Sequence, residues 1–176
     1  MTSRGKLLTW VERQHKDQLV RKTTLPYIHH LKAVAEMADV DPLGYEIGLC
    51  HDLLEDTAVT IDGLHCALLN FNYSKAHALV IVNAVVELTN VFTKDKFPEW
   101  KKSVRKEKEA ERLATISPLA QTVKYADLIY NINWMSTFDL KHLKKYLRKK
   151  KFLLKVMCKG DGSLYRELIQ SLGSVN

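Results

Sequence analysis

The sequence has little glycine, proline or cysteine and no long apolar run. Seven glycines and four prolines in 176 residues, without a repeat or a low-complexity tract, exclude collagen-like, linker-rich and solenoid proteins. The richest apolar stretch, Ala78 to Val86, contains Asn83 and is too short to cross a membrane. The charged N-terminus lacks the apolar segment of a signal peptide. We therefore expect neither a signal peptide nor a membrane span.

The three cysteines, Cys50, Cys66 and Cys158, form no CxxC pair and cannot all pair with one another. This usage fits a reducing compartment, so we expect a cytoplasmic location. With 46% apolar and 27% charged residues, the chain can build a hydrophobic core without disulfides or a structural metal. We expect residues 1–176 to form one domain.

The net charge of +7 comes from one region of the sequence. Between Lys101 and Lys155 there are 15 Lys and Arg against five Asp and Glu, a balance of +10, so the rest of the chain sums to −3. A solvated helical face would account for such a run, and so would a site for an anionic ligand. Nucleic acid is disfavoured, because Tyr146 and Phe152 alone offer few aromatic platforms for stacking bases.

Apolar residues recur at helical spacing throughout, which predicts an all-α fold. Pro26 separates the first two expected helices, and Asp41 with Pro42 reads as the start of the third. The expected helices cover residues 7–20, 28–38 and 42–54, a short segment after Thr60, a longer one after Ser74, and residues 98–114, 118–134 and 140–172, the last as one or two helices. No alternation with turn signals indicates a sheet.

Four ionisable residues crowd the end of the third expected helix. His51 and Asp52 are followed by Glu55 and Asp56, and a spacing of four places each residue on the same helical face as its counterpart. A solvated acidic loop explains them poorly, because carboxylates at a helix C-terminus oppose the helix dipole and repel each other. A bound cation would reverse that penalty.

Further candidate ligands lie on other helical stretches. His30 ends the run Tyr-Ile-His-His, and Asp127 is followed four residues later by Asn131, which could hold a water or a sugar hydroxyl. Two imidazoles and two carboxylates suit a divalent transition metal such as Mn²⁺, Fe²⁺, Co²⁺ or Zn²⁺, with positions left open for water and substrate. The sequence therefore predicts a metal site that could act on an anionic substrate.

In this order, a histidine, His-Asp-x-x-Glu-Asp-Thr and Lys-x-Ala-Asp-x-x-x-Asn resemble the HD-domain phosphohydrolases, and within them the RelA/SpoT-type alarmone hydrolases and their stand-alone small relatives. The strongest signal is the segment from His51 to Thr57, because its Glu-Asp pair separates this branch from HD nucleotidases and cyclic-nucleotide phosphodiesterases. The run from Pro26 to His30 resembles the family's Pro-Tyr-Ile-x-His, which assigns the ligand role to His30. The resemblance covers Gln14 to Phe152.

This resemblance implies a helical HD domain with one buried Mn²⁺. The ligands that it implies are His30, His51, Asp52 and Asp127. The family reaction hydrolyses the 3′-pyrophosphate of ppGpp or pppGpp to GDP or GTP and pyrophosphate, with the metal polarising the phosphoryl group and activating water. Glu55 is expected to orient or deprotonate the water, Asp56 to deal with the leaving oxygen, and Asn131 to assist, although the division between the two carboxylates stays open.

A guanosine with phosphates at both ends also needs positive charge around it. The basic residues that resemble the family's substrate-binding positions are Arg21, Lys22, Lys124 and Arg148. The sequence departs from the family pattern at three places. The 21–26 loop is shorter than the family's usual loop, and Phe152 replaces the family's tyrosine. Lys94 and Lys96 are both candidates for the family's substrate-facing lysine. These departures leave an adenosine alarmone or NADPH as alternative substrates. A non-catalytic domain that binds an alarmone through the basic region 101–155 is an alternative function. Small hydrolases of this family can also act as antitoxins to an alarmone synthetase.

Overall fold

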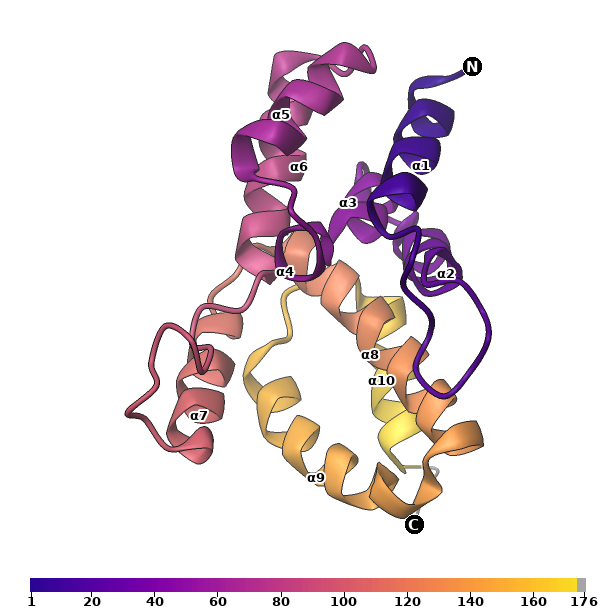
Figure 1. The fold of residues 1–176 in the computed structure, drawn as a ribbon. Coiled ribbons are helices and arrows are strands. Elements are labelled where there is room, and N and C mark those ends of the chain that lie inside the picture. The colour runs from indigo at the N-terminus through magenta and orange to yellow at the C-terminus, as the bar shows by residue number, and fades with distance from the viewer. Residues whose placement is uncertain (174–176) are drawn as a thin grey trace.

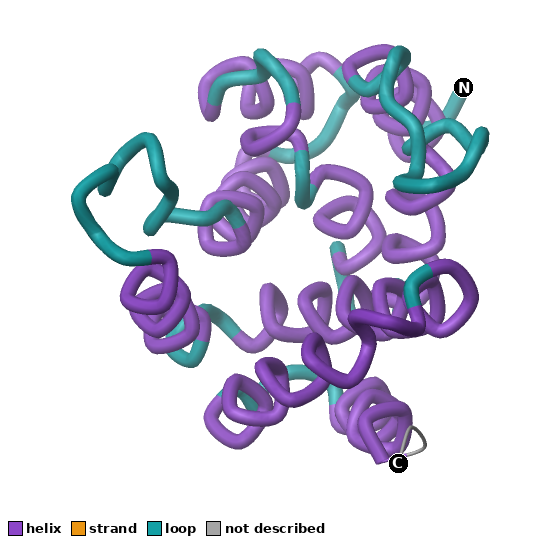
Figure 2. The backbone as a smooth tube through the Cα atoms, turned by 60° about the horizontal axis from the view of Figure 1, so that its bottom comes forward, coloured by secondary structure: helices purple, strands orange, loops and turns teal. Residues whose placement is uncertain are grey.

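The computed structural model describes residues 1–173, apart from the side chain of Phe152. Helices account for nearly all of the regular structure in this part of the chain, as Figures 1 and 2 show. They are α1 (Ser3–Gln14), α2 (Ile28–Ala38), α3 (Gly44–Cys50), α4 (Leu53–Asp56), α5 (Ile61–Asn70), α6 (Lys75–Leu88), α7 (Lys102–Leu113), α8 (Pro118–Phe138), α9 (Leu140–Val156) and α10 (Gly162–Gly173). The predicted all-α class is confirmed. None of the described helices is long and apolar enough to cross a membrane.

Three predicted helix starts are confirmed by their caps. The side chains of Thr60, Ser74 and Ser117 each accept a hydrogen bond from a backbone N–H in the first turn of α5, α6 and α8. A side-chain oxygen at this position satisfies a donor that the helix itself leaves without a partner. These starts depend on neighbouring residues alone, which is why the sequence indicates them correctly.

Other helix boundaries were predicted wrongly. Helix α1 ends at Gln14 rather than near residue 20, since the following loop is closed by a backbone bridge between Leu19 and Pro26. Helix α7 begins at Lys102 instead of residue 98, and α8 continues to Phe138 instead of ending near residue 134. The loop after α1 thereby brings residues 20–27 alongside the end of α8, where Lys22 Nζ contacts the Phe138 carbonyl oxygen.

The third expected helix is in fact two helices. Asp41 does not cap it; the carboxylate instead accepts a hydrogen bond from the Thr122 hydroxyl on α8, and α3 begins at Gly44 after Leu43, whose φ is 66°. Helix α3 then ends at Cys50, and α4 starts at Leu53. His51 and Asp52 therefore lie in a turn between two helices instead of on one continuous helical face.

The core is built around α2, α3 and α8, which pack against one another. Gly48 on α3 permits the closest approach, because a Cβ atom at this position would lie only 2.6 Å from the Ala35 Cα on α2. A hydrogen atom in place of a side chain thus lets α3 press directly onto the backbone of α2. This contact sets the distance between His30, on α2, and His51, just after α3.

Replacing Gly48 with alanine should therefore destabilise the protein. We expect Gly48→Ala to cost about 1–3 kcal/mol of unfolding free energy and to lower Tm by several degrees, because the α2 backbone must move to admit the methyl group. The measurement is thermal unfolding followed by circular dichroism. The matched control is Gly162→Ala, since a Cβ there meets only the Arg166 Nη1 atom, at 3.6 Å. Equal Tm values for the two variants would contradict the expectation.

Candidate active site

Three buried side chains from separate segments meet beneath the α2–α3 contact. His30 comes from α2, His51 from the turn after α3 and Asp127 from the middle of α8. The two imidazole Nε2 atoms are 3.3 Å apart, and they lie 3.7 and 4.0 Å from Asp127 Oδ1. All three ligand atoms lie within 4.8 Å of one another, so they could bind a single ion.

Asp52 lies against the histidine side of this group. Its Oδ2 atom is 3.1 Å from His51 Nε2 and 3.6 Å from His30 Nε2, and it accepts a hydrogen bond of 2.6 Å from the Tyr27 hydroxyl. His29, the neighbour of His30, is exposed and points elsewhere. The four residues proposed as ligands from the sequence are therefore close together, with three of them in the tightest group.

Neighbouring polar groups orient these side chains. His51 Nδ1 lies 2.7 Å from the carbonyl oxygen of Gly48, a position in which the ring donates from Nδ1 and keeps the Nε2 lone pair facing the other ligands. On α8, Lys124 Nζ donates to Asp127 Oδ2 at 2.8 Å, and Asn131 Nδ2 donates to Asp127 Oδ1 at 2.6 Å. Each contact fixes a ligand atom toward the centre of the group.

Neighbouring charges shift the pKa values of His51 and Asp127. Burial lowers the pKa of His51, but the adjacent Asp52 carboxylate outweighs it and raises that pKa to about 9. Burial also opposes ionisation of Asp127, yet the Lys124 ammonium and the His51 imidazole hold its pKa below the usual value. The carboxylates are therefore held in their ionised form, and a divalent cation that binds them would displace the proton from His51 and take up its Nε2 lone pair, giving mixed nitrogen and oxygen ligands.

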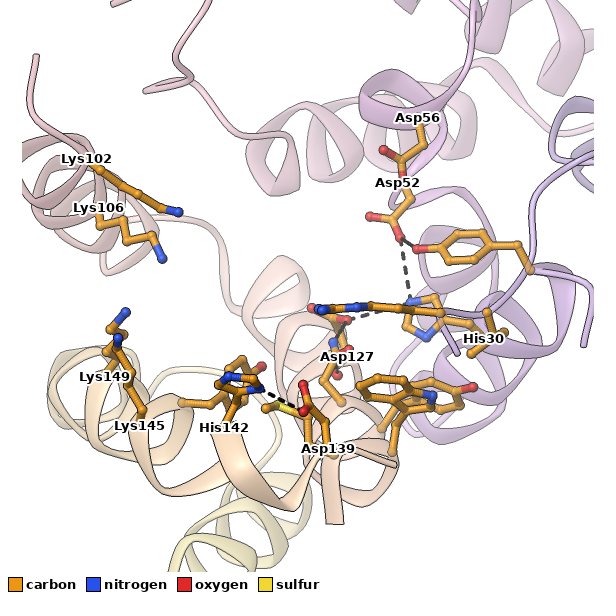
Figure 3. Close-up of a pocket in the computed structure, with 18 residues that line it drawn as sticks. His30, Asp52, Asp56, Lys102, Lys106, Asp127, Asp139, His142, Lys145 and Lys149 are labelled. Carbon is orange, nitrogen blue, oxygen red and sulfur yellow. Dashed lines mark hydrogen bonds and ion pairs between the residues drawn. The ribbon is translucent and has the colours of Figure 1, made fainter. Parts of the chain in front are cut away.

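The group opens into a cavity of about 710 Å³, large enough for a nucleotide-sized ligand. Figure 3 shows His30, Asp52 and Asp127 on one side of it and lysines on the other. The lining residues are Val20, Arg21, Tyr27, His30, Asp52, Asp56, Lys102, Lys106, Asp127, Tyr130, Asn131, Trp134, Met135, Asp139, His142, Lys145, Tyr146 and Lys149. Three of the four candidate metal ligands, His30, Asp52 and Asp127, thus face a cavity that could admit an anionic substrate.

No protein-family model and no curated protein matches the sequence. A solved structure does match: it is described as a metazoan orthologue of SpoT that hydrolyses ppGpp and plays a role in starvation responses. The two chains superpose with a TM-score of 0.79 at 18% identity, over 99% of this chain and 96% of the other. This chain has the HD-domain fold. The architecture inferred from the His-Asp motif is therefore confirmed, and at this identity the likeness concerns the fold alone.

Within the HD-domain fold, the two acidic residues after the His-Asp pair face different directions. Asp56 lines the cavity, and its backbone carbonyl accepts a hydrogen bond of 2.6 Å from Gln18 Nε2. Glu55 does not line it; its carboxylate accepts hydrogen bonds of 2.7 and 2.6 Å from the backbone and side-chain nitrogens of Asn90. Both residues lie on α4, where consecutive side chains point about 100° apart around the helix axis, so one can face the cavity while the other faces Asn90.

The basic residues predicted to bind substrate lie at different places relative to the cavity. Arg21 lines the cavity, whereas Lys124 binds Asp127 and Lys22 forms an ion pair of 3.0 Å with Asp139 at the cavity edge. Arg148 is exposed and lies outside the lining. Lys96 belongs to a separate groove near Thr60, so it does not contact this cavity.

Residue-by-residue reasoning missed the principal basic side chains of the cavity. Lys102 and Lys106 come from α7, and Lys145 and Lys149 from α9. Each pair is spaced by four residues, which places both members on one helical face. This spacing is present in the sequence, but which of several lysine faces meets the site depends on how α7 and α9 dock.

Proposed function

We propose that this protein is a metal-dependent phosphohydrolase that removes the 3′-pyrophosphate of (p)ppGpp, giving GDP or GTP and pyrophosphate. The observation that carries the proposal is the buried group of two histidines and Asp127, which opens into a nucleotide-sized cavity with lysines on its far side. The HD-domain fold supports it, because the solved structure that shares this fold is described as hydrolysing ppGpp.

The residues that would hold the metal are His30, His51, Asp52 and Asp127. We propose that this metal is Mn²⁺, one of the divalent ions that accept mixed nitrogen and oxygen ligands. When bound, such an ion polarises a phosphoryl oxygen and increases the acidity of a coordinated water. Asn131 and Lys124 position the Asp127 carboxylate through their hydrogen bonds, and so support the site without themselves binding the ion.

The cavity assigns the remaining groups distinct tasks. Asp56 lines the cavity beside Asp52 and is the carboxyl group placed to exchange a proton with the substrate or with water. Arg21 lies on the same cavity and supplies a guanidinium for the phosphate oxygens. Glu55 would have to leave Asn90 to reach the reacting atoms, so we assign the proton transfer first to Asp56.

We further propose that residues 1–176 form a single hydrolase domain in a reducing compartment. The buried apolar residues of the described part of the chain form one continuous core. The three cysteines are free thiols, and Cys50 is packed inside that core. Neither feature requires an oxidising environment.

The direct test is hydrolysis by the purified protein. With Mn²⁺ and ppGpp we expect release of pyrophosphate, loss of that activity after treatment with a chelator and its return when Mn²⁺ is restored. The adenosine analogue ppApp and NADPH should be tested alongside, and we expect ppGpp to have the highest kcat/KM. Absence of turnover with all three nucleotides in metal-loaded protein would reject the proposal, and binding of ppGpp without hydrolysis would indicate a non-catalytic domain.

A further inference from the structure

Four lysines form a compact group across the cavity from the candidate metal ligands. Lys102 and Lys106 come from α7, and Lys145 and Lys149 from α9; we call these four residues the lysine cluster. The two helices contact each other, so the pairs form one patch. In Figure 3 the lysine cluster occupies one side of the cavity, while Asp52, Asp56 and His30 occupy the other.

The lysine cluster has no acidic partner within the described part of the chain. Two other basic residues on α7 are paired, Lys108 with Glu111 and Arg112 with Glu109. Burial and the charges of the other three members lower the pKa of Lys106, so the ammonium groups act on one another. Holding four like charges together is unfavourable, and a bound polyanion would relieve the repulsion.

The cavity between the two charged sides has polar and apolar walls: Figure 3 shows Asp139 and His142 there, and aromatic side chains also belong to the lining. Tyr130, Trp134 and Met135 on α8 line it together with Tyr146 on α9. Apolar and aromatic walls suit a nucleobase and a sugar, whereas phosphates would bind the lysines at one end and a metal held by the carboxylates at the other. The cavity therefore matches a ligand with an anionic group at each end and an aromatic ring system between them.

We propose that the lysine cluster is a second anion subsite, which binds the 5′-phosphates of a nucleotide whose 3′-pyrophosphate is hydrolysed at the opposite wall. This role depends on the proposed function and specifies the substrate class: nucleotides phosphorylated at both ends. A substrate that lacks the 5′-phosphates would leave the four ammonium groups without an anion. The protein would then bind the transition state of that substrate less tightly.

The test compares two substrates and two double variants. The variant Lys145→Ala/Lys149→Ala removes half of the lysine cluster, and Lys144→Ala/Lys151→Ala removes the same charge from α9 at exposed positions outside the cavity lining. With ppGpp, we expect the first variant to lose about ten- to a hundredfold in kcat/KM and the control to stay within about twofold of wild type. With guanosine 3′-diphosphate, which has a free 5′-hydroxyl, both variants should match wild type.

Two outcomes would overturn the subsite. One is an equal loss of kcat/KM with ppGpp in both double variants, since it would reflect the overall positive charge of α9 rather than a binding site. The other is an equal loss with both substrates in Lys145→Ala/Lys149→Ala, since the lysines would then act on the reacting phosphate. All these substitutions are at exposed helical positions, so the variants should fold like wild type, which circular dichroism can verify.

A binding measurement separates the subsite from the proposed function. GDP carries the 5′-diphosphate without a 3′-pyrophosphate, and calorimetric titration into chelator-treated protein requires no turnover. We expect Lys145→Ala/Lys149→Ala to weaken GDP binding about tenfold or more, and the control double variant to leave it unchanged. If ppGpp is not hydrolysed but GDP binding still needs these lysines, the proposed function fails and the subsite stands. If hydrolysis occurs and GDP affinity is the same in all three proteins, the subsite fails.

Discussion

Asp127→Ala should abolish both hydrolysis and metal binding. Asp127 is buried on α8, and its Oδ1 atom lies within 4.0 Å of the Nε2 atoms of His30 and His51. Removing the carboxylate takes away one candidate ligand and leaves the two imidazoles and Asp52 beside a Lys124 ammonium without its partner, whose positive charge opposes cation binding. We expect kcat to fall on the order of 10³-fold or more, because the charge that stabilises the transition state is lost with the metal.

The same substitution also affects stability, so a second variant is needed to interpret the loss. Lys124 and Asp127 form a largely buried ion pair, and removal of one partner leaves the other uncompensated. Asp127→Asn keeps the shape of the side chain and an oxygen that can accept from Asn131, and should unfold at a higher temperature than Asp127→Ala while still losing metal. Bound metal is measured by elemental analysis and stability by thermal unfolding.

The matched control for both Asp127 variants is Asp17→Ala. Asp17 is 87% exposed, so its removal changes the net charge by the same amount without touching the site. We expect this control to retain metal, activity and Tm. Metal content and turnover close to wild type in Asp127→Asn would contradict the assignment of Asp127 as a ligand.

The sequence specifies the local features of this site better than its shape. Helical periodicity indicates the all-α class, and the caps at Thr60, Ser74 and Ser117 follow from contacts within three residues. His30 and His51 can be recognised from motifs because a metal restricts which residue types can serve as ligands. In these cases the necessary interaction is either local or fixed by the chemistry of the ion.

Features that depend on docking were not predictable in the same way. The turn at His51 is set where α3 presses on α2 at Gly48, a contact between residues distant in sequence. The choice between Arg148 and Lys149 as a cavity residue is a difference of one position, or about 100° around α9, and it is decided by how that helix packs. Sequence therefore identifies the candidate ligands, while packing determines which charged side chains face them.

The orientation of Glu55 also depends on a distant contact, its hydrogen bonds with Asn90. Because this contact separates Glu55 from Asp56, we expect substitutions of the two carboxylates to differ strongly in their effect on activity. Asp56→Asn should lower kcat by about 10²–10⁴-fold, the usual contribution of a positioned acid or base. Asp56 lines the cavity, and the substitution removes its proton-exchanging group while preserving its size. Glu55→Gln should cost less, because Glu55 is bound to Asn90, 35 residues further along the chain, and glutamine can still accept the Asn90 backbone N–H.

Steady-state kinetics of the two variants with ppGpp and Mn²⁺ provide the comparison, with metal content measured to show that neither change has emptied the site. Asn90→Ala is the informative control, since it removes the side-chain hydrogen bond to Glu55 and leaves the backbone N–H bond and both carboxylates in place. If Glu55 works from its position beside Asn90, Asn90→Ala and Glu55→Gln should have similarly small effects. A loss in Glu55→Gln as large as that in Asp56→Asn would contradict the assignment of proton transfer to Asp56, and would mean that Glu55 leaves Asn90 and enters the cavity during the reaction.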